Sequence, residues 1–152
     1  MKFIRTSQLT GSVLDWAVAT CEQIAIHIGN DGRITLDREK HPDIRCGEVA
    51  AQFGVYSPST LPEQGKPIIE REGIILVNKP NGEWHAIKDT RIDDRHHWEK
   101  NRFTDPTSRQ RKSRPDQFLF ISAAATPLLA AMRCHVAARL GDEIAVPDEL
   151  LT

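Results

Sequence analysis

The sequence predicts a small α+β domain, in which an N-terminal and a C-terminal helix pack against an antiparallel sheet of about four or five strands. Two segments have apolar residues at helical spacing, two others alternate around turn residues, and the remainder is polar. The chain has 152 residues, 39% hydrophobic and 27% charged. We therefore expect residues 1–152 to form one domain with a modest core.

The first helix is predicted to begin near Thr10 or Ser12, either of which can cap it with a side-chain oxygen. Asp15 suits the positive end of the helix dipole. The apolar residues that follow recur at three- and four-residue spacing, as expected of one buried stripe: Leu14, Ala17, Val18 and Cys21.

The last helix has the clearest boundaries. Thr126 is a capping residue, Pro127 suits the first turn, and Gly141 is a typical terminator. One face carries Leu128, Leu129, Met132, Val136 and Leu140. We expect residues 142–147 to form a short extended tail.

Two β-hairpins are predicted. The first joins residues 24–28 to residues 33–36 through a turn containing Asn30, Asp31 and Gly32, residues that tolerate positive φ angles. The second joins residues 73–77 to residues 83–87 through a turn containing Pro80 and Gly82.

The segment between the hairpins is predicted to be irregular. Residues 56–67 contain three prolines and one glycine, and proline removes amide donors. We expect residues 68–72 to be extended, with Glu70 and Glu72 on one face of a strand and Arg71 on the other.

Three ordered motifs in the chain resemble a known family. They are residues 9–19, residues 56–72 with Gly65, and residues 126–147 from Thr126-Pro127-Leu128 to Val146-Pro147. Together they resemble the NinX-like family, small proteins of tailed phages and prophages defined by a domain of unknown function. The resemblance implies an accessory protein of the bacterial cytoplasm that is dispensable for building the virion, and it supplies no catalytic residue.

The chain also departs from the family pattern. Leu61 and Pro62 stand where the pattern has a tryptophan and an acid, and Lys66 stands where a second glycine is usual. A basic loop or insertion at about residues 89–116 is longer than the usual connection. These departures weaken any ligand contact assigned to these places.

The stretch from Tyr56 to Glu72 is the best candidate for a binding site. Hydroxyls on a proline-stiffened loop are pre-organised for a phosphate or a polar ring, and a guanidinium can pair with a phosphate or carboxylate. The candidate ligand-binding residues are Tyr56, Ser57, Ser59, Thr60, Glu70 and Arg71. In the alternative interpretation, the hydroxyls bond the loop backbone and Arg71 bridges its neighbouring acids across a strand face.

A basic segment suggests a different function. Seven Lys or Arg residues against two acids give residues 95–114 a local charge of +5, although the whole chain has a net charge of −1. Such a segment is often a solvated loop, but with Trp98 and Phe103 it could also track a phosphate backbone while the aromatics stack on bases. The candidate residues are Arg95, Lys100, Arg102, Arg109, Arg111 and Lys112.

Signals for metal, redox and catalytic chemistry are weak. The three cysteines are far apart and form no CxxC pair, which favours plain thiols in a reducing cytoplasm, with Cys134 in the core. His96 and His97 are adjacent, so they point in different directions and seldom ligate one ion together. Because no nucleophile elbow, P-loop or dinucleotide motif is present, no catalytic residue, metal or cofactor is predicted.

These observations favour a non-enzymatic phage accessory protein of the host cytoplasm. We expect it to bind a host protein or a small polar, nucleotide-like ligand, and to counter host defence. The alternative is a nucleic-acid-binding accessory protein in phage recombination or replication. The N-terminus turns polar at once and no apolar run reaches membrane-span length, so neither a secretory signal nor a membrane partner is predicted. A homodimer that buries Trp16 or Trp98 is also compatible with the sequence.

Overall fold

The computed structural model describes residues 1–44, 54–89 and 119–151. Its helices and strands mix along the chain, which confirms the predicted α+β class. In order they are β1 (Lys2–Arg5), η1 (Thr6–Gln8), α1 (Gly11–Glu22), β2 (Ile26–Ile28), β3 (Ile34–Leu36), α3 (Pro62–Glu72), β4 (Ile75–Asn78), β5 (Trp84–Asp89), β6 (Leu119–Ala124), α6 (Pro127–Leu140), β7 (Glu143–Val146) and η3 (Asp148–Leu150).

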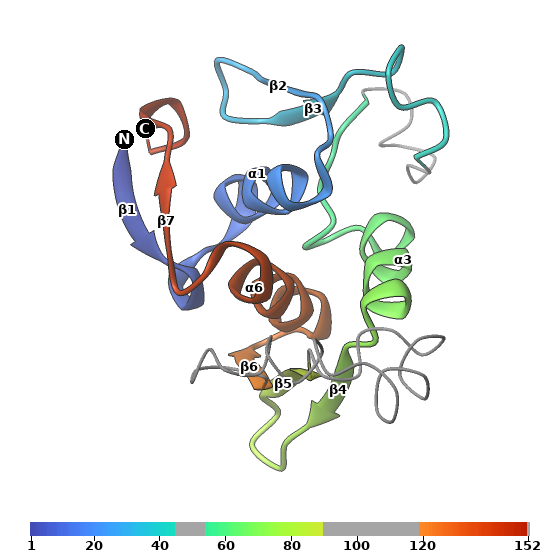
Figure 1. Cartoon of the computed structure of the whole chain (residues 1–152), viewed down its shortest axis with the longest axis vertical. Coiled ribbons are helices and arrows are strands. Elements are labelled where there is room, and N and C mark those ends of the chain that lie inside the picture. Colours follow the sequence, from blue (N-terminus) through green and yellow to red (C-terminus); the bar gives the residue numbers. More distant parts are fainter. Residues whose placement is uncertain (45–53, 90–118, 152) are drawn as a thin grey trace, which may run out of the picture.

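Helix α6 is the centre of the molecule (Figure 1). The Thr126 hydroxyl accepts from the Leu129 amide at 3.2 Å, Pro127 occupies the first turn, and Gly141 ends the helix, as predicted. The prediction of a single apolar face was too narrow, because α1 and α3 contact this helix as well as strands β5 and β6. Its small residues allow this close approach on several sides, and the buried positions are Ala130, Ala131, Met132, Cys134, His135 and Val136.

The strands do not form one sheet of four or five strands, which corrects that part of the prediction. Within the described residues they form two two-stranded sheets, β1–β7 and β2–β3, and one three-stranded sheet, β4–β5–β6, all antiparallel. The chain leaves α6 at Gly141 and returns along β1, so β7 is separated from the β4–β5–β6 sheet by the helix itself (Figure 1). Both predicted hairpins are confirmed as β2–β3 and β4–β5.

Helix α3 replaces the predicted irregular and extended segment. Pro62 lies in the first turn, where its missing amide has no helical partner to lose, and Gly73 ends the helix at φ 63°. Pro67 lies inside the helix, where proline ordinarily weakens it. Packing outweighs this cost, because α3 rests on α6 and buries Gln64 and Ile68.

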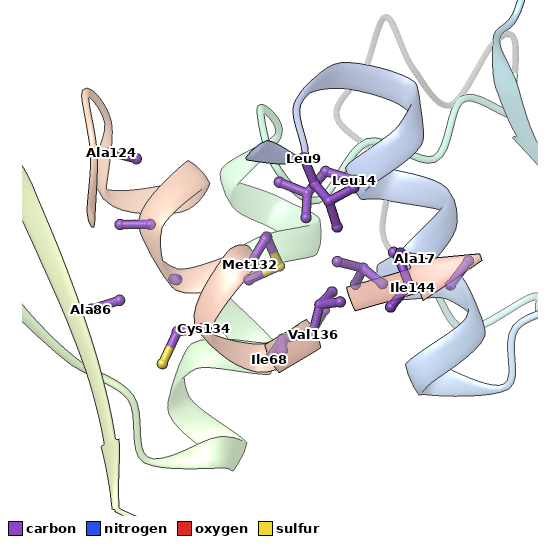
Figure 2. Packing of buried hydrophobic residues seen from close by; sticks show 14 of the residues in the cluster. Leu9, Leu14, Ala17, Ile68, Ala86, Ala124, Met132, Cys134, Val136 and Ile144 are labelled. Carbon is purple, nitrogen blue, oxygen red and sulfur yellow. The ribbon is translucent and has the colours of Figure 1, made fainter. Parts of the chain in front are cut away.

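The core lies on both sides of α6 (Figure 2). Met132 lies with Leu9 and Leu14 at the α1 side, and Cys134 lies toward Ala86 of the sheet. All five side chains are buried, which confirms the core placement of Cys134. Burying a residue such as Leu14 or Met132 contributes roughly 1.5–3 kcal/mol, so α6 couples the two halves of the fold.

The predicted basic segment and the predicted homodimer both involve residues that the structure does not describe. Of the basic segment at 89–116, only Asp89 is described, and it ends β5 rather than lying in a loop. Trp16 is half-buried against the core, Trp98 lies outside the described residues, and the homodimer stays a prediction. No described helix combines the length and the apolar character that crossing a membrane requires.

Candidate functional site

The loop from Val55 to Thr60 is held in place by Asp15 of α1. The Asp15 carboxylate accepts from the Ser57 hydroxyl at 2.7 Å and from the Ser59 amide at 2.9 Å. Burial raises the pKa of Asp15, although these hydrogen bonds oppose the rise. The hydroxyl of Ser57 also bonds that of Thr60 at 2.6 Å. Ser57, through its hydroxyl, and Ser59, through its backbone amide, therefore anchor the loop to α1, whereas the alternative interpretation of the sequence had the hydroxyls bond the loop's own backbone.

Gln64 of α3 completes this anchor from the other side. Its side-chain oxygen accepts from the Ser57 amide at 2.6 Å, and its side-chain nitrogen donates to the Val55 carbonyl at 2.9 Å. Asp15 and Gln64 thus join α1, the loop and α3 into one unit.

Tyr56 is a core residue and its ring is not available to a ligand at the surface. It is 2% exposed, and its hydroxyl has no hydrogen-bond partner. Burial raises the pKa of the Tyr56 phenol well above its usual range, and the negative charges of Glu22 and Asp15 add to the rise. A buried polar group without a partner is uncommon, so the hydroxyl marks a place where a polar atom would be accommodated favourably.

Arg71 lies at the surface, at the C-terminal end of α3. Its guanidinium donates to Glu22 at 2.5 Å and to Glu72 at 3.2 Å, and its side chain is 53% exposed. The predicted strand geometry was wrong, because residues 68–72 belong to helix α3. Glu72 is buried among charged side chains, whereas Glu70 is exposed on the same helix.

Arg71 belongs to an ion cluster, here called the junction cluster, where α1, α3, β5 and α6 meet. Its members are Glu22, Arg71, Glu72, Lys88, His135 and Arg139. Glu22 also accepts from His135 at 2.7 Å. Glu72 also binds the buried Lys88 ammonium and accepts from Arg139 at 2.9 Å.

The cations of the junction cluster lower the pKa values of its two carboxyl groups. Burial alone would raise the pKa of Glu72, but its hydrogen bond to Lys88, the positive charge of Lys88 and its hydrogen bond to Arg139 lower it to about 2. The pKa of Glu22 is lowered in the same way by His135 and Arg71, again against the effect of burial. Both acids are therefore ionised at neutral pH.

The comparisons with known proteins identify the family. A family model described as Bacteriophage P22, NinX matches residues 5–139, well over half of the chain. The chain belongs to the NinX family of phage proteins. The predicted resemblance is thereby confirmed. The comparison with curated proteins gave no match.

The matched NinX region includes the whole junction cluster, from Glu22 to Arg139. The cluster carries three fixed cations, Lys88, Arg71 and Arg139, against two carboxylates. Arg71 and Arg139 are the two members at its rim, 53% and 51% exposed. The arrangement therefore presents positive charge to solvent and keeps its negative charge inside.

A metal ion is disfavoured in the junction cluster of this NinX-family chain. Among the described residues, Glu22, Glu72 and His135 bring possible ligand atoms within 4.8 Å of one another. Each carboxylate is already paired with an Arg or Lys side chain, however, and a divalent ion would have to displace these cations in a site whose net charge is already positive. His96 and His97 lie outside the described residues.

Sequence reasoning missed four residues of the junction cluster: Glu22, Lys88, His135 and Arg139. One signal for them was present. Lys88 continues the inward alternation of Trp84 and Ala86 along β5, and His135 and Arg139 are four residues apart on the central helix. A charged residue on a predicted core face implies a buried partner.

The alternative nucleic-acid site is not described by the structure. All six of its residues lie within 90–118, outside the described ranges: Arg95, Lys100, Arg102, Arg109, Arg111 and Lys112. That site stays a prediction from the sequence.

Proposed function

We propose that this phage accessory protein is a non-enzymatic binding protein of the host cytoplasm. It recognises a polar ligand with an anionic group, either a nucleotide-like small molecule or a host factor, at the surface around Arg71. Membership in a phage protein family supports the accessory role. In this proposal, the binding benefits the phage by blocking a component of host defence.

The position of Arg71 carries this proposal. Of the six predicted ligand residues, Tyr56 is buried, Ser57 and Ser59 anchor the loop, and Arg71 offers a charged group to solvent. Its hydrogen bonds to Glu22 and Glu72 fix the guanidinium before any ligand arrives. Pre-organisation of this kind lowers the entropic cost of binding.

The test is native mass spectrometry of protein isolated from its bacterial host, before and after denaturation. We expect the wild-type chain to retain a small molecule or a host protein, and Arg71→Gln to lose it. Lys66→Gln is the matched control, because Lys66 is an exposed cation of the same helix outside the junction cluster. Equal retention by wild type and Arg71→Gln, or retention by neither, would contradict the proposal.

The nucleic-acid alternative makes an opposite prediction in the same experiment. Binding through the basic segment would survive Arg71→Gln, would be lost in Arg109→Ala and Arg111→Ala, and would weaken steeply with added salt.

A further inference from the structure

Two arginines from different helices meet at one oxygen atom of the junction cluster. Glu72 Oε1 accepts from the Arg71 guanidinium at 3.2 Å and from Arg139 Nη2 at 2.9 Å. The donating nitrogens are therefore no farther apart than the sum of these two distances. Both side chains remain about half exposed. The two guanidinium groups thus form a fixed, adjacent pair at the surface.

The pair keeps donors available to a ligand. Among the described residues, Arg71 uses Nε and Nη2 within the cluster, and Arg139 uses Nη2. A guanidinium carries five N–H donors, so each group has donors beyond those it uses within the cluster. The carboxylate of Glu72 that aligns them is only 5% exposed and is also neutralised by Lys88. It therefore positions the arginines without blocking the approach of an anion.

The geometry of two guanidinium forks discriminates between anions. A planar carboxylate has two oxygens, which a single arginine fork can satisfy. A terminal phosphate has three unesterified oxygens in a tetrahedral arrangement and two negative charges near neutral pH, so it can accept from the remaining donors of two guanidinium groups at once. The cluster has one more fixed cation than anion before binding, and this charge favours a dianion over a neutral ligand.

We propose that Arg71 and Arg139 together bind a phosphate monoester, with Glu72 as the residue that positions both guanidinium groups. This inference rests on the proposed function and adds its ligand class and its second arginine.

The test is calorimetric titration of the intact chain with AMP, inorganic phosphate and acetate. We expect AMP and inorganic phosphate to bind and acetate to bind at least tenfold more weakly. Losing one charged hydrogen-bond donor costs about 1.5–3 kcal/mol, or roughly 10- to 100-fold in affinity. Arg71→Gln and Arg139→Gln should each cause such a loss. Lys66→Gln and Arg33→Gln should leave the affinity unchanged, because both remove exposed cations outside the cluster.

Conservative variants keep the test decisive if a glutamine variant unfolds. Arg71→Lys and Arg139→Lys retain the charge but lose the planar fork, so we expect each to weaken AMP binding while thermal melting confirms the fold. Equal affinity for phosphate and acetate, or wild-type AMP affinity in both Arg139 variants, would overturn the phosphate clamp. If native mass spectrometry still shows an Arg71-dependent load in that case, the proposed function survives the failure of this inference.

Discussion

Asp15 is the single residue on which the candidate-site loop most depends. In Asp15→Ala the buried Ser59 amide and the Ser57 hydroxyl lose their acceptor. We expect a loss of about 2–3 kcal/mol in unfolding free energy, because each unsatisfied buried group costs about 1–3 kcal/mol. Asp15→Asn should remain close to wild type, since its amide oxygen can still accept from the Ser59 amide, its amide nitrogen can donate to the Ser57 hydroxyl oxygen, and burial already disfavours the charge. Urea unfolding of both variants measures this, and an equal loss in both would contradict it.

The thiols of Cys21 and Cys134 should be unreactive in the folded protein. Burial raises the pKa of Cys21 to about 12, helped by the charge of Glu22, and burial raises that of Cys134 to about 11. Because the thiolate is the reactive form, we expect neither residue to be alkylated by iodoacetamide at pH 8, and both to react after unfolding. Peptide mass spectrometry reads out each site. Rapid modification of either residue in the native state would contradict this packing.

At the residue scale, the sequence indicated which charged residue lies at the candidate site, but it did not show which partners the site residues contact. It singled out Arg71, whose charge and neighbours are visible along the chain. It could not show that Ser57 and Ser59 bond to Asp15, because that contact joins residues more than forty positions apart. Lys88 and His135 were not recognised as cluster residues for the same reason, since their partners lie on other elements.

At the scale of elements, Gly65 sets how closely α3 approaches its neighbours. A Cβ at this position would lie 2.5 Å from the Pro58 carbonyl oxygen and 2.6 Å from a methyl group of Leu128. Alanine would add about 1 kcal/mol of helix propensity, but overpacking costs about 1–3 kcal/mol and the carbonyl is backbone that yields little. We therefore expect Gly65→Ala to lose about 1–2 kcal/mol in unfolding free energy. Glu70→Ala, at an exposed position of the same helix, should change it by less than about 0.5 kcal/mol.

Elements with strong local signals were predicted and those that depend on packing were not. Helix α6 carries its own cap, first-turn proline and terminal glycine, and both hairpins carry their turn residues. Helix α3 was missed because its two prolines outweighed its apolar spacing in a local analysis. The division of the strands into three sheets depends on the path of the chain around α6, which no local pattern contains.

At the scale of the whole molecule, the junction cluster links stability to pH. The pKa of Glu72 is about 2 in the folded chain and near 4.5 in an ordinary environment. Its contribution is thus fully present above about pH 4.5 and is lost as the pH falls toward 2, on the order of 3 kcal/mol. Asp15 acts in the opposite sense, because its pKa is raised and its contribution falls as the pH rises.

Paired variants of Glu72 and Lys88 test this linkage. Glu72→Gln alone should lose about 3–5 kcal/mol at pH 7, because it leaves the Lys88 ammonium buried without its carboxylate. Adding Lys88→Met should recover most of the loss, and both the single and the double variant should lack the Glu72 pH dependence between 4.5 and 2, because neither has that carboxyl group. Denaturant unfolding across this range measures both effects. Additive losses in the double variant would show that the pair does not couple these elements.

NMR of the Arg71 and Arg139 side chains tests most directly whether this surface binds an anion. Their side-chain Nε–Hε signals can be followed by NMR while AMP is added to the folded chain. We predict that these two signals shift together and saturate, while the signal of the exposed Arg33 stays in place. Unchanged Arg71 and Arg139 signals, or a small drift shared by every arginine, would contradict the claim that this surface binds an anion.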